Sequence, residues 1–512
     1  MRGKSLMFQG TGSSVGKSLL CAAVLRIMKQ DGWTVAPFKA QNMALNSFAT
    51  SEGLEMGRAQ VTQAEAAGIE PSVKMNPVLL KPTSDRRSQV IVNGKPVGTM
   101  SAMEYELYKP QLRQDIKRIY DELESSVDCV VIEGAGSPAE INLHDGDIVN
   151  MSMAKAADAP VILIGDINPG GVFASLYGTV KLLPEDEQEH IKGIVINKFR
   201  GDVKILEPGL RMLEDLLHIP VLGVIPWMDV DIEDEDSVTE RFDRQTGSGP
   251  IQVAIVHLPH ISNFTDFNIL STERSVSVRY VKRAAELEGA DLILLPGTKN
   301  TIEDLNWLKQ HGLADEIIRH ARRGGMVMGI CGGYQMLGER LFDPEHTESR
   351  IPEMAGLGLL NFDVTFHAEK TTVQSHGTVD CPSGWLSEHN GLMLDGYEIH
   401  SGVNAFGPEC VHFLRLNGRE DIDGITNPAG NVIGTYLHGI FDTGAFWHAL
   451  VSHIRQEKGI QDEGNEIITM GEFRRREYDR LADAVRANLD MDAVYKIIRG
   501  EDVPCGRWNE DE

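Results

Sequence analysis

The sequence is poor in cysteine, in basic residues and in long apolar runs. Its six cysteines include no CxxC pair and no His/Cys cluster with zinc spacing, so we expect neither a disulfide framework nor a structural metal. Lys and Arg total 49 against 75 Asp and Glu, and the net charge of −26 repels nucleic acid and anionic membranes. No segment approaches ~18 consecutive apolar residues, and the N-terminus lacks the pattern of a signal peptide. We therefore expect a cytoplasmic protein that binds neither nucleic acid nor membrane.

Short apolar runs instead alternate with helix-length amphipathic stretches, a pattern typical of βαβ units and parallel sheets. A chain of 512 residues exceeds the usual size of one domain. The charged segment 229–250 ends in Gly, Ser and Pro, as exposed connections between domains do. The sequence thus predicts two doubly wound α/β domains and terminal helices, with one domain at 1–230, a linker at 231–250, a second domain at 251–450 and a helical extension at 451–512.

Residues 10–18, GTGSSVGKS, lie between a strand-like run and a helical run. In that position, backbone N–H groups and the helix N-terminus wrap phosphates, a lysine reaches the β and γ oxygens, and a hydroxyl holds Mg²⁺. Five residues, rather than the usual four, separate the outer glycines. The predicted ATP-binding residues in this loop are Gly10, Thr11, Gly12, Gly16, Lys17 and Ser18.

Three further residues follow strand-like runs of the same domain. Glu133 in VVIEGAG is placed to hold Mg²⁺ together with Ser18, because strand-end carboxylates in this topology face the nucleotide crevice. Lys39 is expected to neutralise phosphate charge, and Asn197 to contact the adenine edge. ATP and Mg²⁺ are therefore expected as co-substrates, without a tightly bound prosthetic group.

The second domain contains the run GMVMGICGGYQ, which predicts a strand turning sharply into a helix at Cys331. Glycines permit such a nucleophile elbow, and the start of the helix favours a thiolate. His438 in YLHG follows a later strand and is the predicted base, while Gly332 and Gly297 are the predicted oxyanion donors.

Cys331 in GICGGYQ and His438 in YLHG resemble the class I, or triad-type, glutamine amidotransferases. The resemblance implies a flavodoxin-like glutaminase domain that releases ammonia from glutamine. Members of that class usually carry a glutamate two positions after the histidine, where this chain has Ile440. Either another group, such as Glu398 in GYEIHSG, orients the histidine, or a Cys–His dyad suffices.

GTGSSVGKS, Lys39 and the EGAG turn resemble dethiobiotin synthetase and related P-loop ligases that phosphorylate carboxylates. Longer strings, among them PFKAQNMALNS, EINLHDGDIVNM and LPGTKNT, are similar to the cobyric acid synthase family across nearly the whole chain. The resemblance implies an ATP-dependent amidoligase in residues 1–230. Glutamine would supply ammonia for four peripheral carboxylates of adenosylcobyrinic acid a,c-diamide, in cobalamin synthesis.

The corrinoid polycarboxylate is the least readable partner. Two polar segments supply candidate corrinoid-binding residues, namely Lys81, Arg86, Arg87, Asn142, Asp145 and Asp147. The alternative is that these segments are ordinary surface loops. Rival functions are cobyrinic acid a,c-diamide synthase, CTP synthase, and a P-loop ATPase switch with a decayed thiol domain. AQNMALNS after Lys39 favours the four-amide enzyme, and Thr11 stands where such switches carry a lysine. Glutamine and ATP complete the small-molecule partners, and a homo-oligomer stays open.

Overall fold

The computed structural model describes residues 3–84, 87–232, 242, 245–408, 410–416, 422–461 and 467–509. The chain divides into two compact units that are discontinuous in sequence. The first contains residues 1–43, 56–232 and 474–512, and the second contains residues 44–55 and 233–473. Residues 44–55, which we call the arm, therefore belong to the second unit although their neighbours on both sides belong to the first. The domain bounds predicted above stay predictions.

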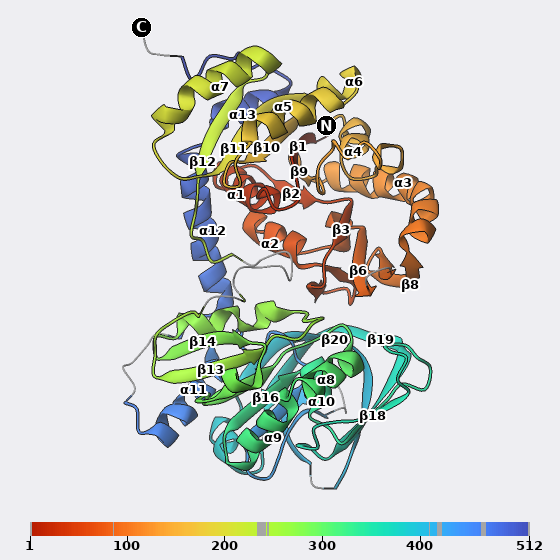
Figure 1. The fold of residues 1–512 in the computed structure, drawn as a ribbon, viewed down its shortest axis with the longest axis vertical. Helices are drawn as coiled ribbons and strands as arrows, with labels where there is room; N and C mark the ends of the chain where they lie inside the picture. The colour runs from red at the N-terminus through yellow and green to blue at the C-terminus, as the bar shows by residue number, and fades with distance from the viewer. Residues whose placement is uncertain are drawn as a thin grey trace. The chain divides into compact units, whose positions relative to one another are not determined.

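A six-stranded parallel sheet forms the centre of the first unit (Figure 1). Its order is β12 (Val221–Pro226), β11 (Ile191–Phe199), β10 (Val161–Asp166), β1 (Lys4–Gly10), β9 (Cys129–Glu133) and β2 (Val35–Phe38). The strands are almost continuously apolar because helices cover the sheet. The direction of winding changes at β1, so the loop that follows β1 lies at the switch point where nucleotides bind.

The main helices of the first unit follow the expected alternation with the strands (Figure 1). They are α1 (Lys17–Gln30), α2 (Arg58–Ala67), α3 (Ala102–Glu124), α4 (Met151–Ala157), α5 (Val172–Leu182), α6 (Glu185–Gln188) and α7 (Val203–Leu217). A small sheet, which the sequence pattern did not predict, joins one strand that precedes α2 to three strands that lie between α2 and α3 in the chain. It contains β3 (Gln41–Met43), β6 (Val78–Ser84), β7 (Arg87–Val92) and β8 (Lys95–Ser101).

The predicted terminal helices are present as α12 (Met470–Arg486) and α13 (Met491–Arg499). Their apolar faces join the core of the first unit, where Leu481 and Val494 are fully buried beside residues of α1. Arg26 Nε of α1 also lies 2.8 Å from Asp479 Oδ1 of α12. The C-terminal residues thus complete a core whose other members come from the start of the chain.

The second unit contains a parallel sheet in the order β14 (Val276–Val281), β13 (Ile251–Val256), β15 (Leu292–Leu295), β16 (Met326–Ile330) and β23 (Val432–Thr435). In chain order this is 2-1-3-4-5, the flavodoxin-like order. The predicted fold class is therefore confirmed for both units. The helices α8 (Thr301–Gln310), α9 (Leu313–Arg322), α10 (Gly332–Met336) and α11 (Ala445–Lys458) also belong to this unit.

A mainly antiparallel extension continues the same sheet beyond β23. It comprises β22 (Ile422–Thr426), β21 (Val411–Leu416), β19 (Phe362–Val379), β17 (Arg340–Phe342) and β18 (Glu353–Ala355), with β20 (Met393–Phe406) on β19. The arm carries β4 (Ser47–Ala49) and the start of β5 (Glu55–Gly57). Among the described residues, no helix combines the length and apolar character needed to cross a bilayer.

Candidate active sites

The predicted phosphate loop joins the end of β1 to the start of α1. Gly16, directly before the helix, has φ 98°, which a residue with a side chain rarely adopts. A Cβ atom there would also lie 2.2 Å from the amide nitrogen of Asn197. The ammonium of Lys17 donates to the carbonyls of Gly12 at 2.7 Å and Gly136 at 3.1 Å. Lysine, loop and the turn after β9 therefore lie together, in the arrangement expected of a phosphate cradle.

Glu133, at the end of β9, is the centre of the polar network beside this loop. Its Oε1 accepts hydrogen bonds from Ser18 Oγ and Lys39 Nζ, both at 2.8 Å. Its Oε2 accepts from Gln63 Nε2 of α2 at 2.5 Å. The structure thus adds Lys39 to Ser18 and Glu133, which the sequence predicted as a pair. Gln63 was missed, because nothing in a helical run distinguishes one buried glutamine from another.

The donor set at Glu133 fits Mg²⁺. A hydroxyl and a carboxylate oxygen in direct contact are hard oxygen ligands, and Mg²⁺ bound to a nucleotide needs few protein ligands besides phosphates and water. Within the described part of the chain, no group of three or more His, Cys, Asp and Glu side chains could hold a metal ion.

Asn197 contacts the phosphate loop directly. Its side chain is buried at the end of β11, and Nδ2 donates to the carbonyl of Val15 at 2.8 Å. The side-chain amide of Asn197 thus holds the phosphate loop through the backbone of Val15. Contact with adenine stays a prediction.

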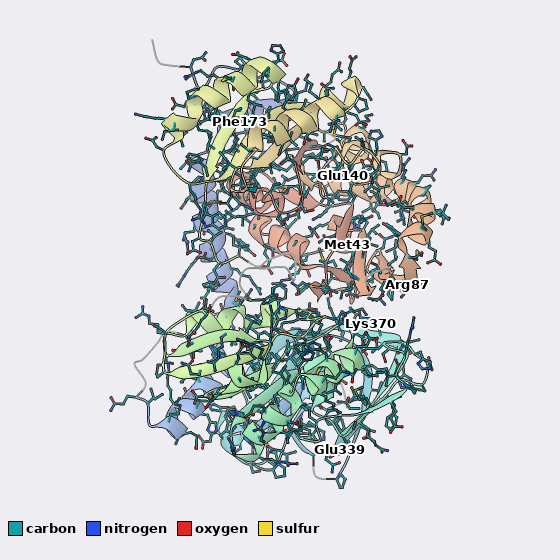
Figure 2. All side chains as sticks on the ribbon, viewed as in Figure 1. Met43, Arg87, Glu140, Phe173, Glu339 and Lys370 are labelled. Carbon is teal, nitrogen blue, oxygen red and sulfur yellow. The ribbon has the colours of Figure 1, made fainter. Side chains whose placement is uncertain are left out.

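The predicted substrate residues come from two separate segments, the small sheet and the segment before α4. Lys81 is buried on β6, whereas Arg87 on β7 is exposed and donates to Thr99 O at 2.6 Å (Figure 2). Asp147 accepts from the backbone N–H groups of three residues at the start of α4, so its carboxylate holds that turn. Asn142 and Asp145 are exposed. Arg86 lies outside the described residues.

Cys331 lies at a strained corner between β16 and α10. Its φ of 51° and ψ of −110° are unusual for a residue with a side chain, as expected of a nucleophile elbow. Gly329 and Gly333 permit the turn, because Cβ atoms there would lie 2.6 and 2.1 Å from backbone atoms. Cys331 is 8% exposed, and its Sγ lies 3.5 Å from the carbonyl of Ile399.

His438 is held on two sides. Its Nδ1 lies 2.7 Å from Asp266 Oδ2, and its ring stacks on Tyr397 with centroids 5.2 Å apart. Asp266 also accepts from the backbone N–H of Gly439 at 3.1 Å. Burial lowers the pKa of His438, but Asp266 and the thiolate of Cys331 favour the protonated ring and raise that pKa to about 10. This is the geometry of a thiol–imidazole–carboxylate triad.

Asp266 therefore occupies the place that the sequence analysis left open. Glu398 instead contacts Ser375 Oγ, and its Oε2 lies 3.5 Å from His400 Nε2. Ile440 is fully buried in the apolar core. Asp266 was missed because it lies 172 residues before His438. No local signal identified it, because Asp266 lies in the helical turn Phe264–Thr272, well past the end of β13, whereas Glu133 is the last residue of its strand.

The two predicted oxyanion residues lie against this centre. A Cβ on Gly297 would lie 3.2 Å from Cε1 of His438. One on Gly332 would lie 3.0 Å from the backbone nitrogen of Thr298. Thr298 Oγ1 donates to Asp304 Oδ2 at 2.5 Å, which fixes the loop after β15. The loop after β15 and the start of α10 thus face each other beside the thiol.

Two family models match the two halves of the chain. The CobQ/CobB/MinD/ParA nucleotide binding domain matches residues 6–237, and the CobB/CobQ-like glutamine amidotransferase domain matches residues 252–446.

Curated relatives are similar over nearly their full length. The cobyric acid synthase of Alkaliphilus metalliredigens is 54% identical over 97% of this chain and 100% of that protein. The corresponding protein of Thermoanaerobacter sp. is 52% identical over 96% and 98% of the two chains. That of Salmonella agona is 50% identical over 98% and 99%. The chain therefore belongs to the cobyric acid synthase family.

Proposed function

We propose that this enzyme amidates the b, d, e and g carboxylates of adenosylcobyrinic acid a,c-diamide, using one ATP for each amide and glutamine as the source of ammonia. The supporting observation is that near-full-length identity of 50–54% to cobyric acid synthases accompanies two sets of reactive side chains. One set surrounds Glu133, and the other surrounds Cys331.

In the ligase half, a substrate carboxylate attacks the γ-phosphorus of ATP and becomes an acyl phosphate, while ADP leaves. Lys17 and the N–H groups before α1 stabilise negative charge on the transferred phosphoryl group. Ser18 and Glu133 would hold Mg²⁺, which neutralises phosphate charge when bound. Ammonia then attacks the acyl carbon, and inorganic phosphate leaves. Activation converts a poor oxide leaving group into a good one.

In the glutaminase half, the thiolate of Cys331 attacks the γ-amide carbon of glutamine. Backbone N–H groups near Gly332 and Gly297 stabilise the oxyanion, and His438 gives its proton to the departing ammonia. Water, deprotonated by His438, hydrolyses the thioester to glutamate. Asp266 keeps Nδ1 of His438 protonated and stabilises the imidazolium.

Lys39 contributes to phosphate binding in this proposal. The corrinoid is assigned to the polar segments around Lys81 and Asp145. Basic residues there would bind the carboxylates of the corrinoid, and acidic residues would bind ammonia or ammonium. The enzyme is placed in the cytoplasm. The proposal includes no prosthetic group and no nucleic-acid or membrane partner. It does not specify whether the enzyme forms a homo-oligomer.

A pair of variants tests the division of labour. Cys331→Ala should abolish glutamine-dependent amidation and leave amidation with ammonium salts intact. Lys17→Ala should abolish both, because carboxylate activation precedes either nitrogen source. Mass spectrometry of the corrinoid products counts the amides added to the a,c-diamide. Ammonia-dependent turnover of the Lys17 variant near that of the wild type, or products that do not gain four amides, would contradict the proposal.

A further inference from the structure

The side chain of Lys299, in the second unit, interacts electrostatically with the thiol of Cys331. Lys299 follows the loop after β15, and its backbone nitrogen donates to His260 O at 3.0 Å. Its side chain is only partly exposed. Within the residues that the structure describes, its ammonium forms no hydrogen bond and no ion pair. The groups that interact with it electrostatically are Cys331, Glu55, Glu348 and Lys370.

Enclosing this ammonium is unfavourable in the protein alone. Burial lowers the pKa of Lys299, and Lys370 lowers that pKa further. Glu55 does not compensate by direct contact, because its Oε2 is engaged 2.6 Å from Nζ of Lys370, which comes from β19 (Figure 2). Lys299 interacts electrostatically with the nucleophile, and among the described side chains no carboxylate lies within ion-pair distance of its ammonium, which points to a carboxylate supplied by the substrate.

A carboxylate on the same side of the thiol complements this lysine. Glu348 Oε2 accepts from the backbone N–H of Thr301 at 3.0 Å, and no cation lies within ion-pair distance among the described side chains. Burial raises the pKa of Glu348, and Lys299 lowers it. Thr301 Oγ1 would lie 3.2 Å from a Cβ on Gly332, which places Glu348 close to the elbow. A free α-amino acid carries the two charges that would complete this pair.

We infer that Lys299 binds the α-carboxylate of glutamine and that Glu348 binds its α-ammonium group. The inference deepens the proposed function and depends on it. Two charged contacts at the α-carbon distinguish free glutamine from the amide side chains of peptides and from ammonia donors without the zwitterion, because an unmatched charge would be left buried in the site. Lys299 and Glu348 are thus assigned to substrate selection, not to bond breaking.

The test compares L-glutamine with two analogues that retain the γ-amide. L-Glutamine α-amide lacks the α-carboxylate, and glutaramic acid lacks the α-amino group. For Lys299→Met, kcat/KM with glutamine should fall by about 100-fold, chiefly through KM, whereas kcat/KM with the α-amide should stay the same or rise. For Glu348→Gln, the preference for glutamine over glutaramic acid should collapse instead. Lys299→Arg should restore part of the preference for the carboxylate.

Lys309→Met in α8 is the matched control, because it removes an ammonium of the same unit whose hydrogen-bond partner among the described residues is the carbonyl of Ala355. It should leave the ratio of glutamine to α-amide turnover unchanged. Equal losses with both substrates in Lys299→Met would overturn the inference and indicate a structural role, with the proposed function intact. A wild-type enzyme that releases no glutamate from glutamine would instead overturn the proposed function.

Discussion

Replacing Asp266 by Asn tests whether this carboxylate is the third member of the triad. At the 2.7 Å separation of Asp266 Oδ2 from His438 Nδ1, the attraction between unit charges is about 6 kcal/mol with an effective dielectric constant of about 20. Desolvation offsets part of it, and breaking a buried charged pair typically costs about 3–5 kcal/mol. Because about 1.4 kcal/mol corresponds to tenfold in rate, glutaminase kcat should fall by about two to four orders of magnitude.

The assay is glutamate release at saturating glutamine in the presence of ATP and the corrinoid. Glu398→Gln is the control, since it also removes the charge of a buried carboxylate of the same unit, and this carboxylate contacts Ser375 and His400. A loss in Glu398→Gln that exceeds the loss in Asp266→Asn would refute the assignment.

The same pair predicts a pH dependence of stability. The pKa of His438 is raised from 6.5 to about 10 in the folded protein, so the protonated ring stabilises the fold. This contribution is complete below pH 6.5 and is lost as the pH rises through about 10. The free energy of unfolding of the wild type should therefore exceed that of Asp266→Asn most strongly near pH 6. A difference between the two that grows from pH 7 to pH 10 would contradict the sign.

Three other substitutions have clear expected outcomes. Glu133→Gln should raise the Mg²⁺ concentration for half-maximal ammonia-dependent amidation at least about tenfold, and an unchanged Mg²⁺ titration would remove Glu133 from the metal site. Gly434→Ala places a Cβ 2.0 Å from the ring of Tyr334 and should lower the free energy of unfolding by about 1–3 kcal/mol. Gly178→Ala in α5 is its control: the added Cβ has no atom within 4 Å, so the free energy of unfolding should stay equal or rise. Arg455→Met removes the guanidinium that lies 2.7 Å from the buried carboxylate of Glu273 and should lower the free energy of unfolding by about 3–5 kcal/mol. A melting temperature within a degree of the wild type would show that this pair contributes little.

The parts of the molecule that could be predicted from sequence are those encoded by neighbouring residues. The phosphate loop and the elbow at Cys331 are short segments whose glycines have no other explanation, and strand periodicity is a local signal. The pairing of Ser18 with Glu133 was also accessible, because parallel strands bring their carboxyl ends to one edge of the sheet.

The rest depends on partners that are distant in the chain. Asp266 and His438 meet because a short helical turn after β13 packs against the loop after β23, and no local pattern encodes that contact. The antiparallel extension beyond β23 likewise combines segments in which polar residues interrupt the strand pattern of alternating apolar and polar side chains. The arm is the clearest case, because its sequence continues that of β3 and yet its residues pack in the other unit.

The arm has a consequence for how this protein can be divided. The chain passes between the units four times, after Met43, Glu55, Ile232 and Phe473. A break after Ile232 would therefore not yield two modules but two interlocked fragments, each carrying pieces of both cores.

A glutaminase fragment begun at residue 245 would also lose the carbonyl of Ser47, which accepts from Asn263 Nδ2 at 2.8 Å. It would lose Glu55 as well, the partner of Lys370. A gene split at the apparent linker would thus encode two halves, each of which needs the other to complete its folded units.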